Sequence, residues 1–85
     1  MGSFRWNEWN LDHVTRHGVS VVEAEKVVRR ASRPWPRRAG ERKWIVEGRG
    51  LGDRPVRVVY LVDSDDAIFI IHAMPLTTRR RRRSR

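Results

Sequence analysis

The fold of this 85-residue chain is decided by two runs of strand-forming residues, Val56-Arg57-Val58-Val59-Tyr60-Leu61-Val62 and Ala67-Ile68-Phe69-Ile70-Ile71-His72. β-branched and aromatic residues dominate both runs, and these residue types pack well on the pleated surface of a sheet. The runs are separated by the acidic residues 63–66, and a polar linker of this length is typical of a hairpin loop. The sequence therefore predicts an antiparallel hairpin at the centre of the fold.

Two helices are predicted upstream of this hairpin. Asn7 can cap the first helix through its side-chain oxygen, and Gly18 follows a basic residue and a histidine, which is typical of a helix end. Ser20 and Glu23 have the spacing of a capping box, so a second helix is expected to begin there. Its apolar residues recur at helical spacing and form one stripe, which consists of Val21, Ala24, Val27, Val28 and Ala31. We expect the remaining charged residues of this helix to form a solvated face.

The segments between these elements complete the predicted topology. Residues 4–6 alternate apolar and polar and suit a short edge strand, whereas the prolines at 34 and 36 end the second helix. Residues 37–42 are interpreted as a basic turn around Gly40, residues 43–47 as another strand, and the glycine-rich residues 48–53 as a hairpin loop. The predicted fold class is α+β, with two N-terminal helices packed on a three- to four-stranded antiparallel sheet. We expect one domain over residues 1–78, followed by an arginine-rich tail over residues 79–85.

Composition excludes several classes of protein. The chain has no cysteine, which excludes disulfides and thiolate metal sites and fits a reducing, cytoplasmic environment. No apolar run approaches the roughly 18 residues expected of a membrane-spanning helix, so no membrane association is predicted. The three histidines are scattered without the paired spacing of zinc ligands, and neither a metal nor a cofactor is expected.

The positive charge is concentrated at one end of the chain. The formal net charge is +9, and six of the 19 Lys and Arg residues lie in residues 79–85, where there is no acidic residue. A charged arm of this kind is suited to neutralising phosphates, whereas the alternative interpretation is a solvated terminus that aids solubility. We predict RNA contacts for its adjacent arginines, Arg79, Arg80, Arg81 and Arg82.

Several blocks together resemble the BrnT-type toxins of bacterial toxin–antitoxin systems. The first blocks are Phe4-Arg5-Trp6-Asn7 and His17-Gly18-Val19-Ser20 with Glu23-Ala24. The later blocks are Lys43-Trp44-Ile45-Val46-Glu47-Gly48, Arg54-Pro55-Val56-Arg57-Val58-Val59-Tyr60 and Ile70-Ile71-His72-Ala73-Met74-Pro75-Leu76-Thr77. The resemblance runs over residues 4–83, and the order of the blocks along the chain is more specific than any single block. Met74 stands where many members of the family carry an arginine.

This resemblance implies a RelE-like fold and a metal-independent endoribonuclease, a hydrolase that inhibits translation by cleaving RNA. It also implies a ribbon-helix-helix antitoxin protein as partner, with promoter DNA bound only through the toxin–antitoxin complex. In such a reaction a base removes the 2′-hydroxyl proton, cations stabilise the charge on the phosphate, and an acid protonates the departing 5′-oxygen.

The candidate catalytic residues are Arg57, His72, His17 and Lys43, and Arg54 is a further candidate for RNA binding. By strand parity His72 shares a face with Ile68 and Ile70, so a structural role and an acid–base role both fit. Arg57 is a charge within an apolar strand, which favours a cleft that binds phosphate. At strand ends, Lys43 and Arg54 also fit a solvated role, and His17 also fits the end of a helix.

Two further features leave alternatives open. The four tryptophans, Trp6, Trp9, Trp35 and Trp44, are expected in the core, although such rings also stack on bases. The rival functional class is a non-catalytic basic module that binds RNA or DNA, and it is distinguished by binding that weakens steeply with salt and by the absence of cleavage.

Overall fold

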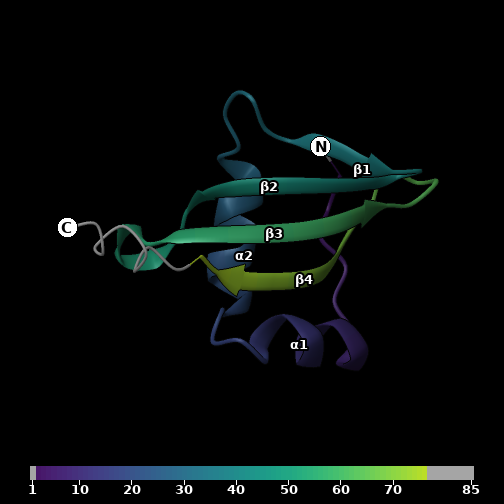
Figure 1. Cartoon of the computed structure of the whole chain (residues 1–85). Helices are drawn as coiled ribbons and strands as arrows, with labels where there is room; N and C mark the ends of the chain where they lie inside the picture. Colours follow the sequence, from purple (N-terminus) through teal and green to yellow (C-terminus); the bar gives the residue numbers. More distant parts are fainter. Residues whose placement is uncertain (1, 77–85) are drawn as a thin grey trace.

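Within residues 2–76, which the computed structural model describes, four antiparallel strands form one sheet in the order in which they occur in the chain (Figure 1). Two helices precede the sheet, and α2 crosses one of its faces while α1 lies alongside β4 (Figure 1). The elements are α1 (Glu8–Thr15), α2 (Val21–Arg29), β1 (Arg37–Gly40), β2 (Lys43–Arg49), the short helix η1 (Leu51–Asp53), β3 (Pro55–Val62) and β4 (Ile68–Pro75). The predicted α+β arrangement is confirmed. None of the helices in this part of the chain is long and apolar enough to cross a membrane.

Both helices begin at the residues that the sequence indicated. The Asn7 side chain accepts a hydrogen bond from the Asn10 backbone N–H, and the Asn10 side chain accepts one from Asn7 N–H, so two otherwise free donors are satisfied. The first helix is followed by Gly18 with φ +84°, a left-handed conformation that glycine adopts without steric cost. Ser20 caps α2 by accepting a hydrogen bond from the Glu23 backbone N–H.

The core lies between the helices and one face of the sheet. Alternate residues of β3 are buried, which places Val56, Val58 and Tyr60 toward the helices and Arg57 on the opposite side. Tyr60 is only 7% exposed. The buried apolar cluster comprises Val14, Val19, Ala24, Val27, Val28, Val46, Val56, Val58, Tyr60, Ile68, Ile70 and Ala73.

The first strand is a correction to the sequence analysis, which interpreted residues 37–42 as a turn. Arg37 pairs with Ile45 and Arg38 with Trp44, and the turn is confined to Glu41 and Arg42. All four residues of β1 are exposed, so the strand depends on backbone pairing with β2 rather than on buried side chains. Intrinsic strand propensity is a weak guide for such an edge strand.

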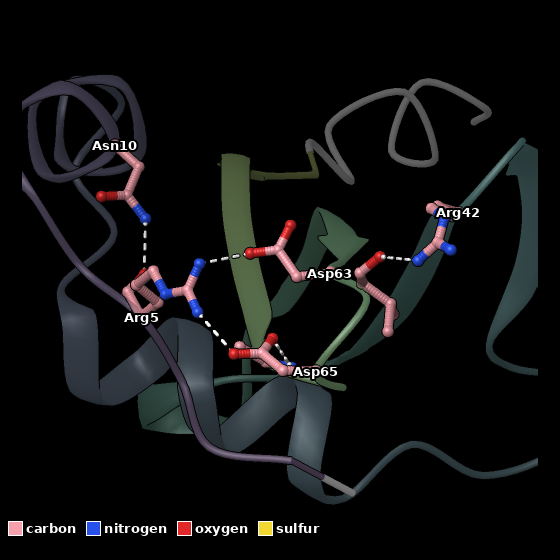
Figure 2. A network of polar contacts seen from close by, with 7 residues as sticks. Arg5, Asn10, Arg42, Asp63 and Asp65 are labelled. Atoms are coloured by element: carbon pink, nitrogen blue, oxygen red, sulfur yellow. Dashed lines mark hydrogen bonds and ion pairs between the residues drawn. The ribbon is translucent and has the colours of Figure 1, made fainter.

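The N-terminal residues 3–5 are hydrogen-bonded to β4 at the other edge of the sheet. Phe4 forms an isolated parallel bridge with Ile68, so the predicted short edge strand is reduced to one pair. Figure 2 shows the Arg5 guanidinium between the carboxylates of Asp63 and Asp65 in the β3–β4 turn. The buried Asn10 amide donates hydrogen bonds to the carbonyl oxygens of Arg5 (3.0 Å) and Ile70 (2.9 Å), which joins α1, this segment and β4.

A buried carboxylate joins α2 to the loop after β2. Glu23, predicted for a capping box, does not return its side chain to Ser20; it accepts hydrogen bonds from Leu51 N–H (2.9 Å) and from Nε (2.9 Å) and Nη2 (2.6 Å) of Arg54. Arg54 also donates to the Gly18 carbonyl oxygen at 2.9 Å. Glu23 is only 1% exposed, so this residue of α2 is not part of a solvated face. A Cβ at Gly50 would lie 2.2 Å from a Glu23 carboxylate oxygen, so the loop requires glycine there.

We predict that Glu23→Gln lowers the free energy of unfolding by about 2 kcal/mol, because it leaves donors of Leu51 and Arg54 poorly paired. The hydrogen bonds from Arg54 hold the pKa of Glu23 below its ordinary value of 4.5. The carboxylate therefore contributes its full stability above pH 4.5, and this contribution is lost as the pH falls through the folded-state pKa. Urea titrations of both proteins between pH 7 and pH 3 test this prediction.

A suitable control is Asp12→Asn, which removes an exposed ion pair with Arg16 and should change stability by less than about 1 kcal/mol. Equal effects of the two substitutions at pH 7 would contradict the structural role given to Glu23.

Candidate functional site

The face of the sheet that points away from α2 carries the candidate site, and we call it the open face. Its residues follow from the strand register, because Arg57 pairs with Glu47 on β2 and with Met74 on β4. They are largely half-buried or exposed, unlike the fully buried residues that alternate with them. The open face comprises Lys43, Ile45, Glu47, Arg57, Val59, Leu61, Phe69, His72 and Met74.

A register shift in β4 places His72 on this face. Tyr60 pairs with Ile70 but Val59 pairs with His72, so Ile71 is the extra residue of a β-bulge. The sequence analysis assigned His72 to the face of Ile68 and Ile70 by simple alternation, and that assignment is wrong. Because of the extra residue, Ile70 is fully buried while His72 is half-buried and opposite Val59.

Helix α1 and the turn that follows it bring two more histidines to the same edge of the open face. His13 and His17 are four residues apart, and the ring centroids of His17 and His72 lie 5.4 Å apart in an edge contact. All three histidines of the chain therefore gather at the α1–β4 seam, although they are far apart in sequence. We call His13, His17 and His72 the histidine cluster. The sequence analysis did not single out His13.

A tryptophan extends this cluster along the seam. Trp9 is 50% exposed, which contradicts the prediction that all four tryptophans pack in the core. Its ring stacks on His13 with a centroid distance of 3.9 Å and lies nearly parallel to the Phe69 ring at 6.1 Å. Trp6, Trp35 and Trp44 do pack against the core. The spacing of Trp9, His13 and His17, four residues each, was the available signal for a common helix face.

Arg57 is the cation of the open face nearest to this cluster. It lies diagonally across from His72, within reach of a long side chain. Its Nε and Nη2 atoms both donate to one carboxylate oxygen of Glu47, at 2.9 and 2.7 Å. The pair is partly solvated, with 45% of the Arg57 side chain exposed, so a phosphate can compete with Glu47 for the guanidinium.

The environment of His72 favours its neutral form. Burial is the main factor that lowers its pKa below the ordinary 6.5, and electrostatic interactions with His17, Arg57 and His13 lower it further. A neutral imidazole at neutral pH can accept a proton, and a phosphate that displaces Glu47 from Arg57 would lie beside it. The arrangement is thus suited to removing a proton beside an anion.

The other predicted site residues lie elsewhere. Lys43 is on the open face, but it lies two strands across the sheet and two residues along it from His72. The regular spacings of a sheet make this separation roughly 12 Å. Arg54 is engaged by Glu23 and by the Gly18 carbonyl, which indicates a structural role for its guanidinium. Arg79, Arg80, Arg81 and Arg82 lie outside the described residues.

Within residues 2–76, no group of three or more His, Asp or Glu side chains has a geometry that would hold a metal ion. A recess of about 440 Å³ on the other face of the sheet is lined mainly by apolar side chains, including Trp44, Tyr60 and Ile68. Its titratable residues are Tyr60 and Asp66, and none of the histidines lines it.

Comparison with known proteins provides no relative for this chain. No protein-family model, no curated protein and no solved structure matches it.

We predict that the pKa of His72, followed by NMR through its ring protons, lies below 6.5 and rises in His17→Gln. The rise should be partial, because burial is the larger cause and remains in the variant. A folded-state pKa below the unfolded value also means that His72 destabilises the fold as the pH falls below about 6.5. A His72 pKa at or above 6.5 would contradict the described environment.

Proposed function

We propose that this protein is a metal-independent endoribonuclease and acts as a BrnT-type toxin that inhibits translation by cleaving RNA. The observation that carries the proposal is the convergence of His72, His17 and Arg57 on one open face through the bulge in β4. Ribonucleolytic transfer without a metal requires a base, an acid and a cation at one phosphate, and these three side chains are of the required types.

The roles follow from their environments. His72, with its lowered pKa, takes the proton from the 2′-hydroxyl, whose oxygen then attacks the phosphorus and expels the 5′-oxygen. His17, which is exposed beside it, donates the proton that the departing oxygen requires. Arg57 exchanges Glu47 for the phosphate and stabilises the added negative charge. The products are a 2′,3′-cyclic phosphate and a 5′-hydroxyl.

The resemblance to BrnT-type toxins supports the cellular part of the proposal. It implies a ribbon-helix-helix antitoxin as partner and promoter DNA bound through the complex, while the absence of cysteine fits a cytoplasmic location. The α+β fold with its helices before the sheet is compatible with the RelE-like class.

We predict that the purified protein cleaves a defined RNA in the presence of EDTA and leaves 2′,3′-cyclic phosphate ends. His72→Ala should lower the cleavage rate by roughly 10²- to 10⁴-fold, and Arg57→Ala by about 10²-fold, with the thermal transition retained. The control is Arg16→Gln, which removes an exposed α1 cation that is paired with Asp12. Full activity in both alanine variants would remove these residues from the site, and metal-dependent cleavage would overturn the mechanism.

A second candidate function is a non-catalytic RNA- or DNA-binding module. It is favoured by the pairing of Arg57 with Glu47 and by Met74, which faces Arg57 where many BrnT-type toxins carry an arginine. The same experiment separates the two functions, because a binding module retards RNA on a gel without producing fragments. Repetition with programmed ribosomes then distinguishes an inactive protein from a toxin that acts on translating ribosomes.

A further inference from the structure

A strongly basic segment lies at the opposite edge of the sheet from the histidine cluster. Residues 33–43, which we call the basic arm, contain five cations and one acidic residue, Glu41. None of these cations forms an ion pair within the described residues, whereas Arg5, Arg16, Arg29, Arg54 and Arg57 all do. The cations of the basic arm are Arg33, Arg37, Arg38, Arg42 and Lys43.

Aromatic rings hold two of these guanidinium groups. Arg37 lies over the Trp35 ring at 5.1 Å, and Arg38 over the Trp44 ring at 6.0 Å. Stacking on a ring restricts the side chain while it leaves the N–H donors at the rim of the guanidinium available. The only polar contacts of these cations are to carbonyl oxygens, from Arg38 to Gly40 and from Arg42 to Val62, among the residues that the structure places. Their positive charge is therefore uncompensated.

The basic arm is part of the same sheet as the candidate site. Arg37 pairs with Ile45, and Lys43 pairs with Leu61, so both side chains lie on the open face. Three strand spacings separate β1 from β4, which is roughly 14 Å. A sheet holds this separation constant, so the arm and the histidine cluster can engage one strand of nucleic acid together.

We propose that the basic arm is a second RNA-binding surface, which holds the phosphates of a single strand whose scissile nucleotide lies at the histidine cluster. The inference rests on the proposed function, and it adds the substrate class. A strand that spans both surfaces is at least roughly four nucleotides long, at the lower end of the site sizes of single-strand-binding folds. Dinucleotides reach only one of the two surfaces and are poor substrates.

An acidic protein segment is the competing occupant, because β1 is an edge strand to which an extended peptide can add. The observations favour RNA. β1 has only four residues, and its register is irregular between Arg38 and Gly40, so it offers few regular backbone hydrogen bonds. Stacked guanidinium groups on both faces of a strand suit a phosphate backbone better.

The test uses the full chain with Arg37→Gln, Arg38→Gln and Arg42→Gln combined, and Arg29→Gln as the matched control. Arg29 is an exposed arginine on α2, but Glu25 already neutralises its charge. The probe is a fluorescent twelve-nucleotide RNA with 2′-O-methyl groups, which has no free 2′-hydroxyl and cannot be cleaved by the proposed route. Its dissociation constant is measured at several salt concentrations.

The combined variant should bind the probe at least about tenfold more weakly. The magnitude of the slope of log K against log salt should fall by about 2, because three arginines are removed and each phosphate contact on a single strand contributes roughly 0.7. Arg29→Gln should match the wild type. An unchanged affinity and slope in the combined variant would overturn the proposal. Loss of binding to a polyglutamate peptide with retained RNA binding would overturn it in favour of an acidic protein partner.

The same variants separate this inference from the proposed function. If the unmodified RNA is not cleaved by the wild type but the methylated probe binds through the arm, the ribonuclease proposal fails and the binding surface stands. If RNA is cleaved and the combined variant binds and cleaves RNA like the wild type, the proposed role of the basic arm in RNA binding is wrong and the ribonuclease proposal stands. Support for both requires that the variant lose more activity on the long RNA than on a dinucleotide.

Discussion

The extra residue at Ile71 is the constraint on which the candidate site depends. A strand without this bulge would have His72 in the core, because its side chain would follow Ile68 and Ile70. With the bulge, Ile70 and Ala73 can both face the helices while His72 faces outward between them. Packing of α1 against β4 then brings His17 to the same point, held by the hydrogen bond from the Asn10 amide to the Ile70 carbonyl. Core packing and site geometry are thus determined by one local irregularity.

The charged side chains differ in whether they have a partner. Two glutamates of α2 are paired with arginines: Glu23 with Arg54 and Glu25 with Arg29. The arginines of β1 are exposed to solvent. On the open face, Arg57 is paired with Glu47, which is itself partly exposed. Buried charges require partners because their desolvation is costly, whereas exposed cations can remain unpaired until a ligand arrives. The cations without a buried partner therefore include those of β1 and the open face.

Much of the fold was predictable, because helix caps and apolar periodicity are local signals. Asn7, Ser20 and Gly18 marked the helix ends, and the two apolar runs marked β3 and β4. Three features had no such signal. The strand β1 is built from residues with little strand preference. The bulge at Ile71 changes the face of the sheet on which His72 lies, and no residue type in the sequence marks it. Glu23 binds Arg54, which is 31 residues away in the sequence. Of the candidate site residues, His17 and His72 lie in contact and Arg57 lies diagonally across from His72, whereas Lys43 and Arg54 lie elsewhere.

The position of the unpaired arginines also affects how copies of this protein behave toward one another. An open strand edge exposes backbone groups that can template pairing with a second sheet, and β1 is such an edge. Arg37 and Arg38 line it, so two copies approaching edge to edge bring like charges together, and the chain is protected from self-association. A polyanion that neutralises these arginines removes the protection. Under the proposal that the basic arm binds RNA, self-association and nucleic-acid binding would therefore be coupled at this edge.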